Sequence, residues 1–172
     1  MSQLKVNSII PVSGVPTGGG GGIIQVKQVV KLDSFTTTST SAVDVTGLSV
    51  NITPTSTSSK ILVMVSMPIG TDDANFTYGR LFRGNTQLAE ASEASNRPRP
   101  TFMCFLANEG QLFMESFTFL DSPNTTSATT YKMKLQAASS GTATVGRSFR
   151  DTNETGFDPR CSSTLTVMEV SA

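Results

Sequence analysis

The sequence predicts an all-β fold, an antiparallel β-sandwich of jelly-roll-like type preceded by an extended N-terminal arm. Apolar and polar residues alternate with a period of two in many short runs, which is typical of strands with one buried face. Counting the sequence gives 24 threonines and 22 serines, residues that favour strands and turns. No run keeps the 3.6-residue apolar period of an amphipathic helix.

The N-terminal segment differs from the rest of the chain. Residues 1–22 are expected to form an anchoring arm and a linker, and residues 23–172 a β-sandwich domain. The linker is a hinge of five residues without side chains, namely Gly18, Gly19, Gly20, Gly21 and Gly22. No Lys-Ser/Thr pair and no expected helix follow these glycines, so a phosphate-binding loop is excluded.

The arm itself has one short apolar stretch that ends at Pro11. An extended segment of this kind can add a strand to the exposed edge of another sheet. We therefore expect the arm to dock onto a larger assembly through its apolar residues, Leu4, Val6, Ile9 and Ile10.

The body contains about nine or ten candidate strands at the spacing of a sandwich or barrel. The run 60–65 is continuously apolar and short enough to be a central strand. The other expected strands cover 24–32, 43–52, 78–83, 86–89, 102–106, 113–119, 131–135, 143–149 and 165–170. Gly84-Asn85 is a two-residue hairpin signal between two of them. Another sandwich topology and a partly closed barrel fit the same pattern.

The composition argues against an enzyme. The chain has no histidine and no tryptophan, so the common catalytic triads and histidine metal sites are excluded. We expect no catalytic residue, no cofactor and no metal. Cys104 and Cys161 are interpreted as two buried thiols. The net charge of +0 predicts no nucleic-acid partner, and no apolar run is long enough for membrane insertion.

The charged residues allow few alternatives. Asp72, Asp73 and Asn75 could supply oxygen ligands for calcium, but solvated loop charge is the preferred interpretation. Arg80 and Arg83 are an odd number of residues apart, so they should point to opposite faces of a strand and not form one patch. The longest expected loops, which are candidates for recognition, cover 70–77, 84–100 and 150–161.

Several segments resemble one family, the small virion structural proteins, often tail-fibre-like, of tailed phages of marine bacteria, including cyanophages. They are spread over nearly the whole chain as turn-and-strand patterns: 4–9, 24–26, 43–48, 58–63, 81–84, 120–123, 129–132 and 164–169. The resemblance implies a virion component that assembles in the bacterial host cytoplasm with other virion proteins, without a cofactor. By analogy with fibre proteins we expect a homotrimer.

Three functions follow as hypotheses. The first is a fibre or knob module that docks by its arm and contacts a glycan or receptor on the host surface. The second is a capsid decoration protein on the phage head. The third, from a different class, is a carbohydrate-binding module, because β-sandwiches bind sugars at their loops; the missing tryptophan counts against it.

Overall fold

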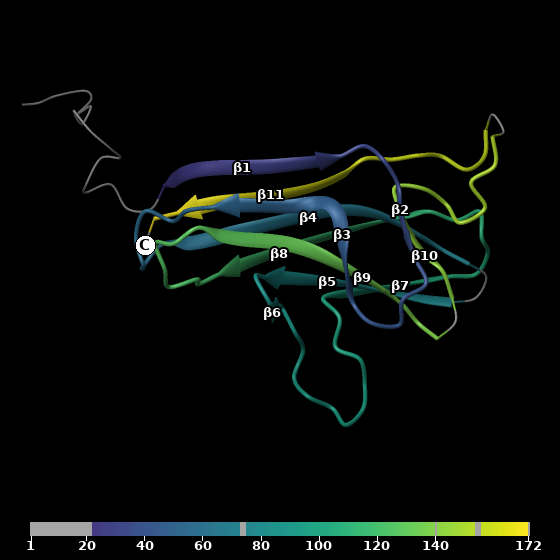
Figure 1. Cartoon of the computed structure of the whole chain (residues 1–172), viewed down its shortest axis with the longest axis horizontal. Coiled ribbons are helices and arrows are strands. Elements are labelled where there is room, and N and C mark those ends of the chain that lie inside the picture. The colour runs from purple at the N-terminus through teal and green to yellow at the C-terminus, as the bar shows by residue number, and fades with distance from the viewer. Residues whose placement is uncertain (1–21, 73–74, 140, 154–155, 172) are drawn as a thin grey trace, which may run out of the picture.

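A computed structural model describes residues 22–72, 75–139, 141–153 and 156–171. Within these residues the regular structure is entirely β, which confirms the predicted fold class (Figure 1). No helix of the described residues is long and apolar enough to cross a membrane. The strands are β1 (Ile23–Lys31), β2 (Phe35–Thr37), β3 (Val43–Ile52), β4 (Lys60–Thr71), β5 (Asn75–Arg83), β6 (Thr86–Leu88), β7 (Phe102–Leu106), β8 (Phe113–Asp121), β9 (Thr129–Ala137), β10 (Ala143–Val145) and β11 (Ser163–Val170).

The long strands form two antiparallel sheets. In the first sheet the order is β1-β11-β4-β8, and the short strands β10 and β2 continue beside the far end of β4. In the second sheet the order is β3-β9-β5-β7, and β6 pairs with the end of β5. The pairs are therefore nested along the chain: β1 with β11, β3 with β9, β4 with β8 and β5 with β7. This nesting, a long hairpin folded over on itself, is the jelly-roll arrangement that the sequence predicted.

The core lies between the two sheets and follows from the period-two pattern of each strand. In β4 the inward residues Ile61, Val63, Met67 and Ile69 have no exposed surface, which confirms the prediction of a central strand. In the second sheet, Tyr131, Met133 and Leu135 of β9 are also fully buried. Such close-packed apolar layers stabilise the sandwich by roughly 25 cal/mol per Å² buried.

Several expected strands have different bounds in the structure, and particular residues explain two of the differences. β4 continues past Pro68 to Thr71, because Met67 and Ile69 extend the buried row, and the loop expected over 70–77 is correspondingly shorter. The strand expected over 143–149 ends at Val145. Gly146 adopts a positive φ of 81° and lies against the carbonyl groups of Asp33 and Cys161, so the chain turns there and cannot continue the ladder.

Candidate functional site

The expected docking residues Leu4, Val6, Ile9 and Ile10 lie outside the described residues, as do Gly18 to Gly21. Gly22 is described, and it pairs with the end of the last strand. Its N–H donates to Ser171 Oγ at 2.9 Å, and its carbonyl accepts from the Ser171 N–H at 3.0 Å. The arm therefore joins the body beside the C-terminal end of β11; the docking and hinge roles themselves stay predictions.

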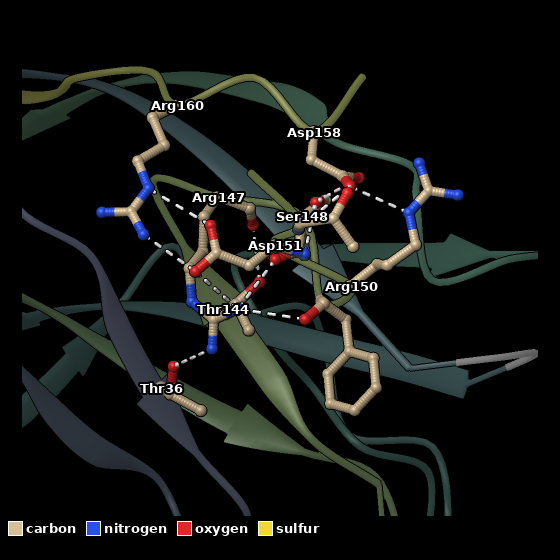
Figure 2. Close-up of polar contacts among 10 residues, drawn as sticks. Thr36, Thr144, Arg147, Ser148, Arg150, Asp151, Asp158 and Arg160 are labelled. Carbon is tan, nitrogen blue, oxygen red and sulfur yellow. Dashed lines mark hydrogen bonds and ion pairs between the residues drawn. The ribbon is translucent and has the colours of Figure 1, made fainter. Parts of the chain in front are cut away.

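A polar cluster belongs to the loop 146–161, which contains the segment 150–161 expected to carry recognition (Figure 2). Asp158 is its centre, with a side chain that is 0% exposed. One carboxylate oxygen accepts from Ser148 Oγ at 2.9 Å. The other accepts from Arg150 Nε at 2.8 Å and from the N–H and hydroxyl of Thr152. The bond between Ser148 and Asp158 joins residues that are ten positions apart and so closes the loop.

A second carboxylate connects the same loop to the sheet. Asp151 Oδ2 lies 2.8 Å from Arg160 Nη2 and 3.5 Å from Arg147 Nη1. Arg147 also donates to the carbonyls of Ser148 and Phe149 and, through Nη2, to Thr36 Oγ1 on β2 at 3.0 Å. Figure 2 shows how the three arginines surround the two carboxylates. These contacts join the described residues 147–151 and 158–160 to each other and to β2.

The electrostatics of Asp158 indicate a structural role. The hydrogen bonds from Arg150, Thr152 and Ser148 lower the pKa of Asp158 well below its ordinary value. Both carboxylate oxygens are occupied by donors, so this group is held as an anion. A general acid or base needs a pKa near the working pH and a free position for a substrate proton. The cluster therefore orders the loop and offers no acid–base chemistry.

Two further buried carboxylates tie the fold together. Asp121 of β8 accepts two hydrogen bonds from Arg83 of β5, at 2.7 and 2.8 Å, and one from the Tyr131 hydroxyl of β9 at 2.6 Å. This cluster joins the first sheet to the second. Burial, followed by the bond to Asp121, raises the pKa of Tyr131 above its ordinary value. Arg80 points instead to the outer face, where it donates to Gln136 and Gln87, so the predicted opposite orientation of the two arginines is confirmed.

Glu169 of β11 is the second of these carboxylates and is fully buried. It accepts from Gln25 Nε2 at 2.6 Å and from the N–H and hydroxyl of Thr55 at 2.7 and 2.6 Å. Burial by itself would raise the pKa of Glu169, but the hydrogen bonds from Gln25 and Thr55 outweigh it and lower the pKa. The carboxylate fixes the crossover between β3 and β4 to the first sheet.

The residues weighed as calcium ligands are partly described. Asp72 Oδ2 accepts from the Thr142 N–H at 2.8 Å, and its Oδ1 accepts from Thr71 Oγ1 at 3.2 Å, whereas Asp73 lies outside the described residues. No group of three or more carboxylates or cysteines suited to a metal ion occurs among the residues described. Asp72 thus ties the end of β4 to the segment before β10, which lies 70 residues further along the chain.

The two cysteines are free. Cys104 is buried, as expected, and its burial raises the pKa of the thiol to about 11. It is therefore protonated and unreactive at neutral pH. Cys161 is only partly buried, which differs from the expectation of a buried thiol, because it lies where the loop 146–161 returns to the sheet.

An exposed aromatic pair lies on the outer face of the second sheet. Phe76 of β5 and Phe105 of β7 have ring centroids 4.8 Å apart and are 40% and 49% exposed. Tyr78 and Met103 are cross-strand partners on the same face. Sequence reasoning missed this pair because the two residues are 29 positions apart and meet only through the pairing of β5 with β7.

Comparisons with known proteins give structural likenesses only. No protein-family model matches the sequence, and no curated protein matches it. Among solved structures, the infectious bursal disease virus Gx strain matches 94% of this chain and 45% of that chain, at 15% identity and a TM-score of 0.42. The Gt strain matches 94% and 46%, at 13% identity and a TM-score of 0.40.

The VP2 subviral particle of the same virus matches 94% of this chain and 46% of that chain, at 13% identity and a TM-score of 0.37. The chain spans less than half the length of these viral chains. At TM-scores this low, the likenesses carry no argument about what the chain does.

Proposed function

We propose that the chain is a virion structural protein of a tailed bacteriophage, displayed as a fibre or knob module and docked by its N-terminal arm. The observation that carries the proposal is the jelly-roll arrangement of the two sheets, an architecture used by viral capsid domains and by lectins. A fold alone does not decide function. The second support is the resemblance of the segments 4–9, 58–63 and 164–169 to virion structural proteins of marine phages.

The layout of the molecule suits a displayed module. The body begins at Gly22 and β1, beside the C-terminal end, and the described residues of the loop 146–161 lie at the opposite end of the long axis (Figure 1). A module anchored at the first end would present the second. The partners in this proposal are other virion proteins, further copies of the chain in a homotrimer, and a receptor or glycan on the host surface. The proposal includes no catalytic activity and no cofactor.

Labelling of intact particles tests this function. Gold-labelled antibody against the body, residues 22–172, is expected to bind virions at the tail, because the arm would dock there and leave the sandwich exposed. Labelling over the whole head would instead support the capsid decoration alternative. Labelling of neither part, with the chain absent from purified virions by mass spectrometry, would contradict a virion role. Virions lacking the gene serve as the control.

A carbohydrate-binding function is the second candidate, favoured by the exposed Phe76–Phe105 pair. Aromatic faces that remain exposed on a rigid sheet can stack on the apolar face of a sugar. If host-surface glycans bind there, Phe105→Ala should abolish their binding in a glycan array, whereas Phe113→Ala, at an equally exposed phenylalanine of β8, should not. Equal binding by both variants would reject this candidate.

A further inference from the structure

The outer face of the first sheet carries an apolar row that crosses four strands. The strand register places Val26 opposite Met168, Met168 opposite Leu62, and Leu62 opposite Leu120. Residues directly opposite each other in antiparallel strands lie on the same face of the sheet. These four side chains, the Val26 row, therefore form one line across β1, β11, β4 and β8.

The two ends of the Val26 row are exposed in the single chain, and Met168 and Leu62 between them are half-buried. Val26 and Leu120, at its two ends, are 51% and 54% exposed, and Met64, in the next row, is 41% exposed. The residues that alternate with them, such as Ile61 and Val63, point inward and are fully buried. The first sheet is therefore apolar on both faces. The inner face packs in the core, and residues 146–148 cover the outer face only at the Pro68–Gly70 end of β4.

The rest of this outer face carries little charge along β1, β11, β4 and β8, whereas Arg147 contacts Thr36 of β2 beyond the end of these strands. Along the described strands, its one charged residue is Lys60 at the end of β4, and Lys60 Nζ donates to Ser122 Oγ at 2.8 Å. The other outward residues that keep some exposure are Gln28, Val30, Met64, Ser66, Met114, Ser116, Thr118, Thr164 and Val170, whereas Pro68 and Thr166 are buried.

The outer face of the second sheet is different. It carries Asp44, which lies 2.8 Å from Lys132 Nζ and 3.2 Å from Lys134 Nζ, together with the guanidinium of Arg80. Interspersed charges of both signs are typical of a solvated surface. The outer face of the second sheet thus combines charged groups with the exposed Phe76–Phe105 pair, whereas the exposed residues on the outer face of the first sheet are apolar or uncharged polar apart from Lys60.

We propose that the outer face of the first sheet, centred on the Val26 row, packs against a second copy of this chain. A neutral face can meet its own copy without placing like charges opposite each other, whereas a charged foreign partner would find no counter-charge on it. Four strands about 4.8 Å apart and about 27 Å long give roughly 500 Å² per copy, the smallest area expected of a specific interface. Packing of one face on the same face of another copy is a two-fold contact, so the inference rests on the self-association in the proposed function and not on its three-fold symmetry.

Light scattering of the full chain tests the proposal. At micromolar concentration, the wild-type protein is expected to have the native mass of at least two chains of 18.2 kDa each. Met64→Glu places a charge at the centre of the face and should weaken association by at least about 30-fold, the cost of disrupting an interface hot spot. Leu120→Glu, on the edge strand β8, should act in the same direction. Both variants should then have the mass of one chain.

Met103→Glu is the matched control, because Met103 is 51% exposed on the outer face of the second sheet. This variant should keep the wild-type mass. An oligomer that persists in both face variants, or that dissociates only in Met103→Glu, would overturn the assignment of the face. A wild-type mass of one chain would overturn the homo-oligomer as well, but not the virion role, which particle labelling tests separately.

A measurement on the wild-type chain needs no substitution and therefore does not depend on how the variants fold. Met64 and Met103 are similarly exposed in one chain, so hydrogen peroxide would oxidise them at similar rates in a monomer. In the proposed oligomer, mass spectrometry should find Met64 oxidised several-fold more slowly than Met103. Equal rates in a sample with oligomeric mass would reject this face as the interface.

Discussion

At the scale of single residues, Glu169 shows how a charge can be buried in a sandwich core. Its carboxylate accepts three hydrogen bonds, one from Gln25 of the neighbouring strand and two from Thr55 of the crossover. A buried charge is tolerated when its hydrogen-bonding capacity is satisfied. The same rule applies to Asp121 between the sheets and to Asp158 inside its loop.

The lowered pKa of Glu169 predicts that the protein becomes less stable in acid. A carboxyl whose pKa is lower in the folded than in the unfolded protein stabilises the fold above its ordinary value, here 4.5. That stabilisation is lost as the pH falls from 4.5 through the lower pKa of the folded state. The free energy of unfolding, measured by urea titration at each pH, should therefore decrease below pH 4.5.

Glu169→Gln should reduce this acid dependence, because the variant has no proton to gain at that position. Glu93→Gln, at an exposed glutamate in the 89–101 segment, is the control and should keep the wild-type dependence. If the free energy of unfolding of Glu169→Gln decreased in acid as much as that of the wild type, other carboxylates, such as Asp158, would account for the effect.

At the scale of elements, β5 and β7 depend on one close contact. Phe102 begins β7, and its ring covers Gly79 of β5, its cross-strand partner. A Cβ added at Gly79 would lie 2.1 Å from an atom of that ring. Glycine is needed at this position because the aromatic ring occupies the space of any side chain.

Gly79→Ala should therefore lower the free energy of unfolding by about 1–3 kcal/mol, the usual cost of overpacking. The same substitution in a Phe102→Leu background should cost clearly less, because the smaller side chain leaves room for the methyl group. Urea denaturation of the four proteins gives this double-mutant cycle. Additive effects of the two substitutions would contradict a direct clash.

At the scale of the whole molecule, the sandwich has two chemically different outer faces. The second sheet carries the ion pairs of Asp44 with Lys132 and Lys134, whereas the first sheet carries the Val26 row, which is exposed at its two ends. This difference has no use in an isolated monomer, since an exposed apolar face only adds unfavourable contact with water. The mass and oxidation measurements proposed above test which of the two faces a second copy covers.

The sequence by itself determined the fold class, the central position of β4 and the opposite orientations of Arg80 and Arg83. These properties depend on the period of two within a strand, which is local and can be read from neighbouring residues. The inward orientation of Glu169 follows from the same alternation in β11. The predicted end of the strand over 143–149 was wrong, because the left-handed backbone conformation of Gly146 ends β10 early.

Only the tertiary structure decided which distant residues meet. The Asp121–Arg83–Tyr131 cluster joins three strands of two sheets, and the Asp158 cluster depends on how one loop closes. The Val26 row likewise exists only because the register aligns four strands that are far apart in sequence. Alternation tells which face of its own strand a residue occupies, but not which residue of another strand lies opposite, and that register is set by long-range pairing and packing.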